Sequence, residues 1–240
     1  MLEDNEHLVW RGILDPSLLK DDVVAVGHLL ADAAKAGDWS TVFDLLDDPR
    51  ADINSWRPGG PAWFTPLHQA AWHGVPVDIA AGLLQRGAVR SLRDAHGRTA
   101  HDIRCQRDLE GEKPKDVAVQ QHNSLALRER YLKPSPSPLT PATVQALDHH
   151  LAGVIDGRIR GVLYDGRDPR HVLRYPPVDI LHEVAGNRVW FPVPGMYGGF
   201  DITLMNDVLD VKSWCRVVGG SGQQHLISVH GASLVADGLQ

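Results

Sequence analysis

Features typical of secreted, membrane-spanning and metal-binding proteins are scarce in this chain of 240 residues. The two cysteines, Cys105 and Cys215, lie in different halves of the sequence, so they cannot build a disulfide framework or a four-cysteine metal site. No apolar run approaches the roughly 18 residues of a membrane span, and the acidic N-terminus lacks the apolar segment of a signal peptide. We therefore expect a cytoplasmic protein with no membrane association, no metal and no cofactor.

Positive charge is also in short supply. Lysine and arginine total 24 against 30 acidic residues, which gives a formal net charge of −6. A protein that binds nucleic acid without sequence preference needs a basic field, so we expect no nucleic-acid partner. The composition, 43% hydrophobic and 22% charged, is that of a globular chain, and the length suits one large or two modest domains.

The most informative stretch that is present is residues 65–74, which read TPLHQAAWHG. Thr65 followed by proline is a typical helix start, because proline lacks the N–H that a first helical turn cannot pair. Small alanines on the apolar stripe of this helix let a second helix approach closely, and the final glycine predicts the helix end. An amphipathic segment over residues 76–85 predicts a second helix.

Two other stretches repeat parts of this pattern. Residues 97–103 restart it one helix pair later, and residues 30–37 match its first helix. A helix–turn–helix unit of about 33 residues that opens with T-P-L-H resembles an ankyrin repeat. The resemblance implies a stack of helical repeats over about residues 23–107, with a degenerate last repeat and an N-terminal cap from the first residues.

Residues 133–141 contain four prolines and no apolar periodicity, which is typical of an extended connector. We therefore predict three parts: an ankyrin-like domain with its cap over residues 1–132, a linker over 133–141, and a second domain over 142–240. Thr140 and the proline after it predict a helix to about Asp156. Beyond residue 188, short β-branched and aromatic segments alternate with turn signals, so the second domain is expected to be α+β with a small antiparallel sheet.

This second half is also similar to a small domain of uncharacterised bacterial proteins. The similarity lies in two stretches, WFPVPGMYGGF at residues 190–200 and SWCRVVGGSGQQH at residues 213–225. It implies a bacterial source and no particular activity.

The ankyrin resemblance implies a concave face and finger tips that bind a protein partner. Tryptophan, arginine and tyrosine carry much of the binding energy at such surfaces when they are exposed, although tryptophans can equally cover a core. The candidate partner-binding residues are Trp56, Arg57, Trp63, Trp72, His73, Arg93 and His96. For His68 the resemblance implies a structural role, in which it ties the turn to the helix by hydrogen bonds.

Two glycine-rich loops carry the case for chemistry, because successive backbone N–H groups can hold an anion. The alternative is that both loops are hairpin turns that need glycine's positive φ. The candidate ligand-binding residues are Gly195, Gly198, Gly199, Gly219, Gly220 and Gly222. The candidate catalytic residues are Arg216, Ser221, His225 and Cys215, of which Cys215 can equally be a buried small hydrophobe.

Adjacent histidines at 149 and 150 are expected to point to different sides of a solvated helix. The sequence therefore favours a cytoplasmic protein-binding module, in which the helical stack recognises a protein and the second domain supplies a specificity or effector surface. An immunity or antitoxin-like role fits this layout by analogy. The alternative is an enzyme or small-ligand-binding protein with an anion pocket between the two glycine loops.

Overall fold

A computed structural model of the chain describes residues 7–110, 125–160, 166–215 and 221–239. The chain divides into two compact units. The helical unit comprises residues 19–135, and the sheet unit comprises residues 1–18 together with 136–240.

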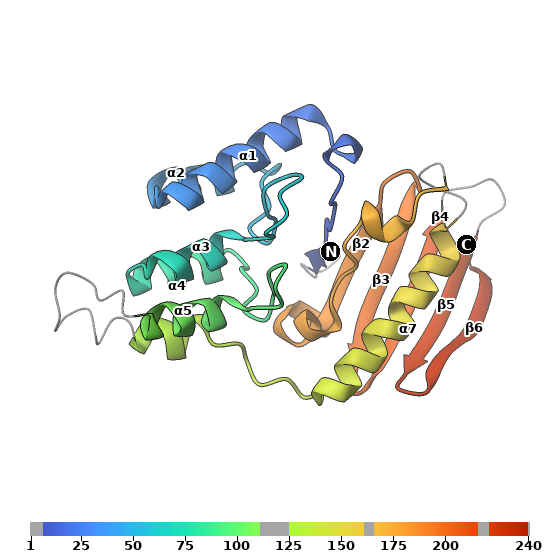
Figure 1. The fold of residues 1–240 in the computed structure, drawn as a ribbon. Helices are drawn as coiled ribbons and strands as arrows, with labels where there is room; N and C mark the ends of the chain where they lie inside the picture. Colours follow the sequence, from blue (N-terminus) through green and yellow to red (C-terminus); the bar gives the residue numbers. More distant parts are fainter. Residues whose placement is uncertain (1–6, 111–124, 161–165, 216–220, 240) are drawn as a thin grey trace, which may run out of the picture. The chain divides into compact units, whose positions relative to one another are not determined.

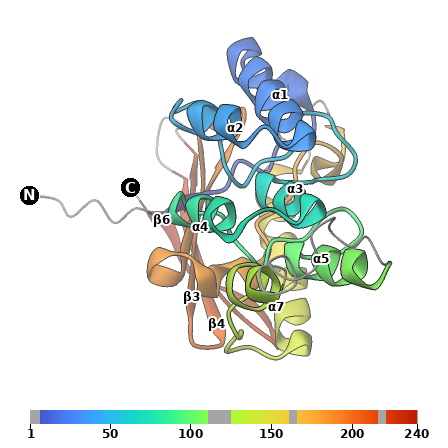
Figure 2. The ribbon, with the colours of Figure 1, turned by 90° about the vertical axis from the view of Figure 1, so that its left-hand side faces the viewer.

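The helical unit contains five α-helices and one π-helical turn among its described residues. They are α1 (Asp21–Ala36), α2 (Trp39–Leu46), α3 (Pro66–His73), α4 (Val77–Gln85), α5 (Ala100–Leu109) and the π-helical η2 (Leu127–Leu132). Within this unit α3 lies between α1 and α5 (Figures 1 and 2), and η2 packs on α4 and α5.

Capping side chains fix where two of these helices begin. At α3, the Thr65 hydroxyl lies 2.8 Å from Nδ1 of His68, and the backbone N–H of Thr65 donates to the same nitrogen over 3.3 Å. At α5, the hydroxyl and the N–H of Thr99 both donate to the carboxylate of Asp102. These are capping boxes, which satisfy N–H groups that a helix start leaves unpaired. His68 thus has the structural role expected of it.

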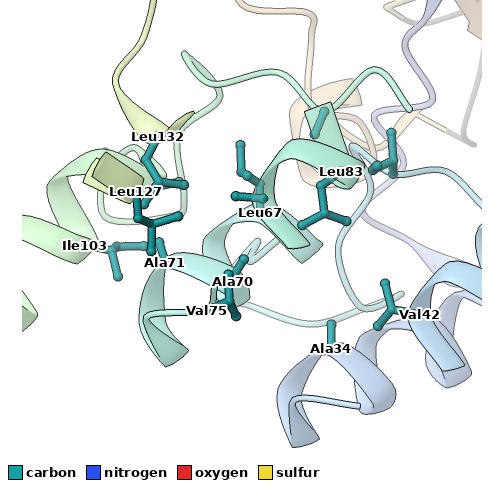
Figure 3. Packing of buried hydrophobic residues seen from close by; sticks show 14 of the residues in the cluster. Ala34, Val42, Leu67, Ala70, Ala71, Val75, Leu83, Ile103, Leu127 and Leu132 are labelled. Carbon is teal, nitrogen blue, oxygen red and sulfur yellow. The ribbon is translucent and has the colours of Figure 1, made fainter. Parts of the chain in front are cut away.

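Alanines let the helices of this unit pack closely around one core. Ala34 on α1 and Ala70 and Ala71 on α3 are each at most 1% exposed, and Leu67 and Leu83 fill the space beside them (Figure 3). A helix whose contact face is alanine lets its neighbour approach, which increases the number of van der Waals contacts. The core of the helical unit therefore follows the apolar pattern of the sequence.

The prediction of an ankyrin-repeat stack over residues 23–107 is nevertheless wrong. The chain has a mixed α+β fold, and no stack of repeats is evident in the described residues. Residues 47–65 contain no helix, and the described chain resumes after α5 at residue 125, with two α-helical residues that lead into the π-helical η2. Threonine caps and spaced alanines specify where a helix starts and which face packs, and any helical fold can use them. They do not specify a repeat.

The sheet unit is built on six strands in the order β1 to β6. The strands are β1 (Leu8–Val9), β2 (Arg188–Val193), β3 (Gly198–Met205), β4 (Val208–Cys215), β5 (Gly222–Ser228) and β6 (Gly231–Leu239). Strands β2 to β6 are antiparallel neighbours, as the alternating sequence pattern predicts. The sheet as a whole is mixed, because β1 pairs with β2 in parallel, and the prediction of a purely antiparallel sheet is wrong in this respect.

Residues 8–18 belong to this sheet unit. Leu8 pairs with Val189, and the backbone N–H of Trp10 donates to the carbonyl oxygen of Trp190 over 2.8 Å. The indole of Trp10 is 2% exposed and donates to the carbonyl oxygen of Arg174 over 2.7 Å. The N-terminal cap predicted from the ankyrin resemblance is therefore wrong.

One long helix, α7 (Pro141–Ile159), lies across one face of the sheet and packs on β5 and β6 (Figure 1). It starts where the sequence predicts, since the Thr140 hydroxyl accepts a hydrogen bond from the N–H of Thr143. The remaining elements of the unit are short 3₁₀ turns: η1 (Pro16–Leu18), η4 (Pro169–His171), η5 (Val178–Glu183) and η6 (Ala185–Asn187).

Asp148 on α7 makes the stability of the sheet unit depend on pH. Burial raises its pKa to about 6, although its carboxylate accepts a 2.8 Å hydrogen bond from the N–H of Val178. In the unfolded chain this carboxyl releases its proton near the ordinary aspartate pKa of 3.8, so the folded state binds more protons between about pH 4 and 6. The contribution of Asp148 to stability is therefore fully present below that window and is lost as the pH rises through it.

Replacing Asp148 by asparagine is expected to raise the free energy of unfolding at pH 7–8 by roughly 1–3 kcal/mol. The amide oxygen can still accept from Val178 and carries no charge to desolvate. Denaturant unfolding of both proteins across this pH range measures the effect. The gain in the free energy of unfolding is expected to shrink toward pH 4. A gain of the same size at pH 4 would contradict the raised pKa of Asp148.

Candidate functional site

The predicted finger-tip residues of the helical unit lie in different environments. Trp56 is 7% exposed and packs against Trp63, with 6.0 Å between the ring centroids, so it covers the core and offers no surface. Arg57 donates to the carboxylate of Asp32, and its guanidinium lies 3.3 Å from Nδ1 of His28. These contacts are internal to the unit.

Trp72 and His73, at the end of α3, are exposed as the sequence predicts. The guanidinium of Arg107 lies over the ring of Trp72 at 4.1 Å, and the indole stays 41% exposed. His73 lies edge-on to Trp39, and its Nε2 forms a 3.1 Å hydrogen bond with the backbone oxygen of Lys35. Two tryptophans, a histidine and an arginine therefore occur together at one end of the helices.

Arg93 and His96 lie on the loop before α5. Arg93 donates to the carbonyl oxygen of Gly97, and the N–H of His96 donates to the buried carboxylate of Asp94. Burial works against ionisation of Asp94, but hydrogen bonds from Arg98 and His96 outweigh it and hold the pKa of Asp94 below its ordinary value. Both predicted residues are exposed on a loop that this carboxylate holds in shape.

The first glycine-rich loop of the sheet unit is the hairpin turn between β2 and β3. Gly195 has a φ of 84° in that turn, whereas Gly198 and Gly199 are part of β3. Gly222 is the first residue of β5. Gly219, Gly220 and Arg216 lie outside the described residues. Gly195 thus fits the alternative of a hairpin turn that needs positive φ, whereas Gly198, Gly199 and Gly222 lie in strands and do not.

The candidate nucleophiles are not paired with a base. The thiol of Cys215 donates to the backbone oxygen of Met196 over 2.7 Å, which ties the β2–β3 turn to β4. The hydroxyl of Ser221 lies 3.4 Å from the carbonyl oxygen of Cys215. Among the described residues, His225 forms no hydrogen bond with either side chain. Neither Cys215 nor Ser221 is therefore activated by His225 through a hydrogen bond.

His225 instead lines a groove of about 570 Å³ between α7 and the strands β5 and β6. Four more basic side chains line the same groove: His149, His150 and Arg158 from α7, and Arg170 from η4. No aspartate or glutamate lines it among the residues that the structure describes. The expectation that the adjacent histidines face different sides of a solvated helix is wrong, because both line the groove, with their rings 5.3 Å apart.

Arg158 is oriented by neutral oxygen atoms. Its Nε donates to the hydroxyl of Ser213 over 3.2 Å, and its Nη2 donates to the carbonyl oxygen of Ser221. In the described part of the chain no carboxylate pairs with it, whereas Arg170 donates to Asp156 over 2.7 Å. The guanidinium of Arg158 is therefore fixed in place while its charge stays uncompensated by a described side chain.

His225 carries a polar atom that the surrounding protein does not satisfy. Its Nδ1 is buried and has no hydrogen-bond partner in the described residues. Burial and the positive charge of Arg158 lower the pKa of His225, against the opposing effect of Asp237. A buried nitrogen without a partner is uncommon in a folded protein and marks a place where a bound molecule can supply one.

Two glycines within α7 keep the groove open. A Cβ placed on Gly153 or on Gly157 would meet nothing within 4 Å, so neither glycine is needed for packing. Glycine inside a helix costs about 0.5–1 kcal/mol relative to alanine. The two glycines therefore make α7 less stable where it faces the groove. Glycines inside a helix are the sequence signal by which the groove could have been found.

Metal-ligand clusters and membrane-spanning helices are both lacking among the described residues. No group of three metal-ligating side chains occurs among them. No helix that the structure describes is both long enough and apolar enough to cross a membrane.

Comparison with known proteins gives no family. No protein-family model matches the chain, and a search of curated proteins finds no match. The resemblances to ankyrin repeats and to a bacterial domain therefore have no support from relatives.

Proposed function

We propose that the sheet unit binds a small organic anion in the groove between α7, β5 and β6. The observation that carries the proposal is Arg158, which two neutral oxygens hold at the groove with its charge unpaired among the described residues. Preorganised cationic donors of this kind recognise carboxylate or phosphate oxygens, because little ordering is left to be done on binding. The groove volume of about 570 Å³ suits a small molecule.

The histidines and the apolar wall extend this recognition. His149, His150 and His225 add imidazole N–H donors to the lining of the groove. Val154 and Leu234 supply apolar surface for the carbon skeleton of the ligand. Binding is the activity that these residues support best, since the Cys215 thiol is hydrogen-bonded to a backbone oxygen.

Octanoate serves as the test ligand, because it joins one carboxylate to an apolar chain. Replacing Arg158 by glutamine is expected to weaken its binding at least ~10-fold, the equivalent of about 1.4 kcal/mol. The amide keeps a polar tip and removes the charge. Isothermal titration calorimetry of the whole chain at pH 6 measures the change.

Arg160→Gln is the matched control. Arg160 is two residues along and loses the same charge, but it pairs with Asp156 and Asp168 and does not line the groove. We expect this variant to bind octanoate as the unmodified chain does. Equal affinities for all three proteins would contradict the role of Arg158.

A second candidate function is protein binding by the helical unit. It is favoured by the exposed ring of Trp72 under the guanidinium of Arg107, beside His73. Tryptophan and arginine are the residue types that most often dominate binding energy at protein interfaces. The partner would be a protein large enough to contact this end of α3 and also the loop of Arg93, which lies beside the residues that precede α3.

For this second function, Trp72→Ala and Arg93→Ala are each expected to abolish association with a co-purifying partner while leaving the circular dichroism spectrum unchanged. Arg86→Ala provides the control, since Arg86 stacks on Phe43 at the end of α4. Retention of the partner by both test variants would rule this surface out.

A cytoplasmic location is also proposed. It is supported by the two cysteines, which are both free thiols, as is usual in reducing compartments.

A further inference from the structure

We infer that the groove of the sheet unit binds an elongated molecule that carries an anionic group at each end. This inference rests on the proposed anion binding and names the class of ligand. It follows from how the basic and apolar side chains are distributed along the groove.

The basic side chains of α7 lie at two levels of one helical stripe. His149 and His150 lie near its middle, Gly153 and Gly157 follow at one-turn intervals, and Arg158 lies near its C-terminal end. At 1.5 Å per residue, eight residues separate His150 from Arg158 by about 12 Å along the axis. The segment between them presents glycine and Val154 to the groove, so the positive groups are separated by an uncharged stretch.

Strands β5 and β6 form the wall of the groove that faces α7, and their pairing places the two ends of the groove along the strands. Arg158 donates to Ser213, which pairs with Gln223, so the arginine end lies at the start of β5. His225 follows two residues along and pairs with Leu234 on β6. Because α7 runs antiparallel to β5 (Figure 1), the histidine pair lies farther along the strands, toward Ala232.

These positions define what the ligand must offer. An oxyanion at one end can accept from Arg158 and Gln223, and a second oxyanion can accept from His149 and His150. The middle contacts Leu234 and the open helix surface at the two glycines, next to the unpartnered Nδ1 of His225. A linear dicarboxylate has this chemistry, whereas a compact anion reaches only one end.

Suberate and octanoate test the inference, because they have the same chain length and differ in the second carboxylate. Titrated into the whole chain at pH 6, suberate is expected to bind at least ~10-fold more tightly than octanoate, since the second end adds its interactions within one molecule. Succinate, whose carboxylates are too close to span the groove, is expected to lose this advantage.

The double variant His149→Gln, His150→Gln removes the second anchor from partly exposed positions. Suberate is then expected to bind this variant no more tightly than octanoate binds it, so that the ratio of the two affinities falls from ~10 to about 1. Melting curves of this variant check that it folds.

The outcomes separate the two proposals. If octanoate and suberate bind equally well, or if the double variant leaves the difference intact, the elongated-dianion inference is overturned and the anion site stands. If neither compound binds the unmodified chain, the anion site itself is overturned.

Discussion

Replacing Gly199 by alanine is expected to destabilise the sheet unit by about 4 kcal/mol or more, or to prevent it from folding. A Cβ at this position would lie 2.2 Å from the carbonyl oxygen of Phe191 and 2.9 Å from Cα of Pro192. Both are backbone atoms of the neighbouring strand β2, so they cannot move aside without breaking the β2–β3 pairing. Glycine is therefore required at Gly199 for close approach.

The same glycine lets two tryptophans meet. Trp214 pairs with Gly199 across β3 and β4, and the ring of Trp190 reaches within 2.9 Å of the place where a Cβ would be. The two indoles stack at 4.8 Å between centroids. Amide hydrogen exchange across β2 and β3 during denaturant unfolding reports on this part of the sheet unit.

Gly153→Ala is the matched control, because the same methyl group enters open space in a helix interior. It is expected to raise the free energy of unfolding by about 0.5–1 kcal/mol. If both alanine variants had similar stabilities, the close approach of β2 and β3 at Gly199 would be wrong.

Replacing Trp10 by alanine is expected to cost about 3–5 kcal/mol, and the loss should fall on the sheet unit. The indole is 2% exposed, donates to the carbonyl oxygen of Arg174, and has the Arg174 guanidinium 5.6 Å from its ring centroid. Its removal leaves a cavity and an unsatisfied carbonyl where the N-terminal segment joins β2.

Amide hydrogen exchange locates this loss. Protection is expected to fall across β2 and at Leu173 and to persist in α3 and α4 of the helical unit. Trp72→Ala, which truncates a tryptophan that is 41% exposed, is expected to cost much less. Loss of protection confined to α1 and α2 would instead mean that the first residues cap the helices.

Local chemistry made part of the fold predictable. Thr65, Thr99 and Thr140 begin helices because their hydroxyls pair with early N–H groups, which requires only nearby residues. The alternation of apolar and polar residues predicted strands such as β3, because this pattern also lies within neighbouring residues. The ankyrin assignment is wrong because similar helix starts recur without a repeating tertiary arrangement, which local signals do not encode.

The mixed sheet could not be predicted, because β1 has only two residues and no detectable period. Its partner β2 lies about 180 positions away in the sequence, and nothing in Leu8 or Val9 indicates that pairing. Long-range strand pairing depends on the assembled core of the sheet unit.

Of the described residues that the sequence analysis named as catalytic or ligand-binding candidates, His225 alone lines the groove. Arg158 becomes informative through Ser213 and Ser221, which are distant in sequence and adjacent only in the folded unit. His149 and His150 followed by Gly153 and Gly157 can be seen in the sequence. That they line a groove depends on which face of α7 the sheet covers, which the sequence does not show.

The central claim is that anions bind between α7, β5 and β6, and an amide-resolved NMR titration of the whole chain with suberate tests it most directly. We predict that chemical-shift changes concentrate in residues 149–158, 222–225 and 232–234, and that Arg158→Gln raises the suberate concentration at their midpoint at least ~10-fold. Shift changes confined to the helical unit, or none at saturating suberate, would contradict it.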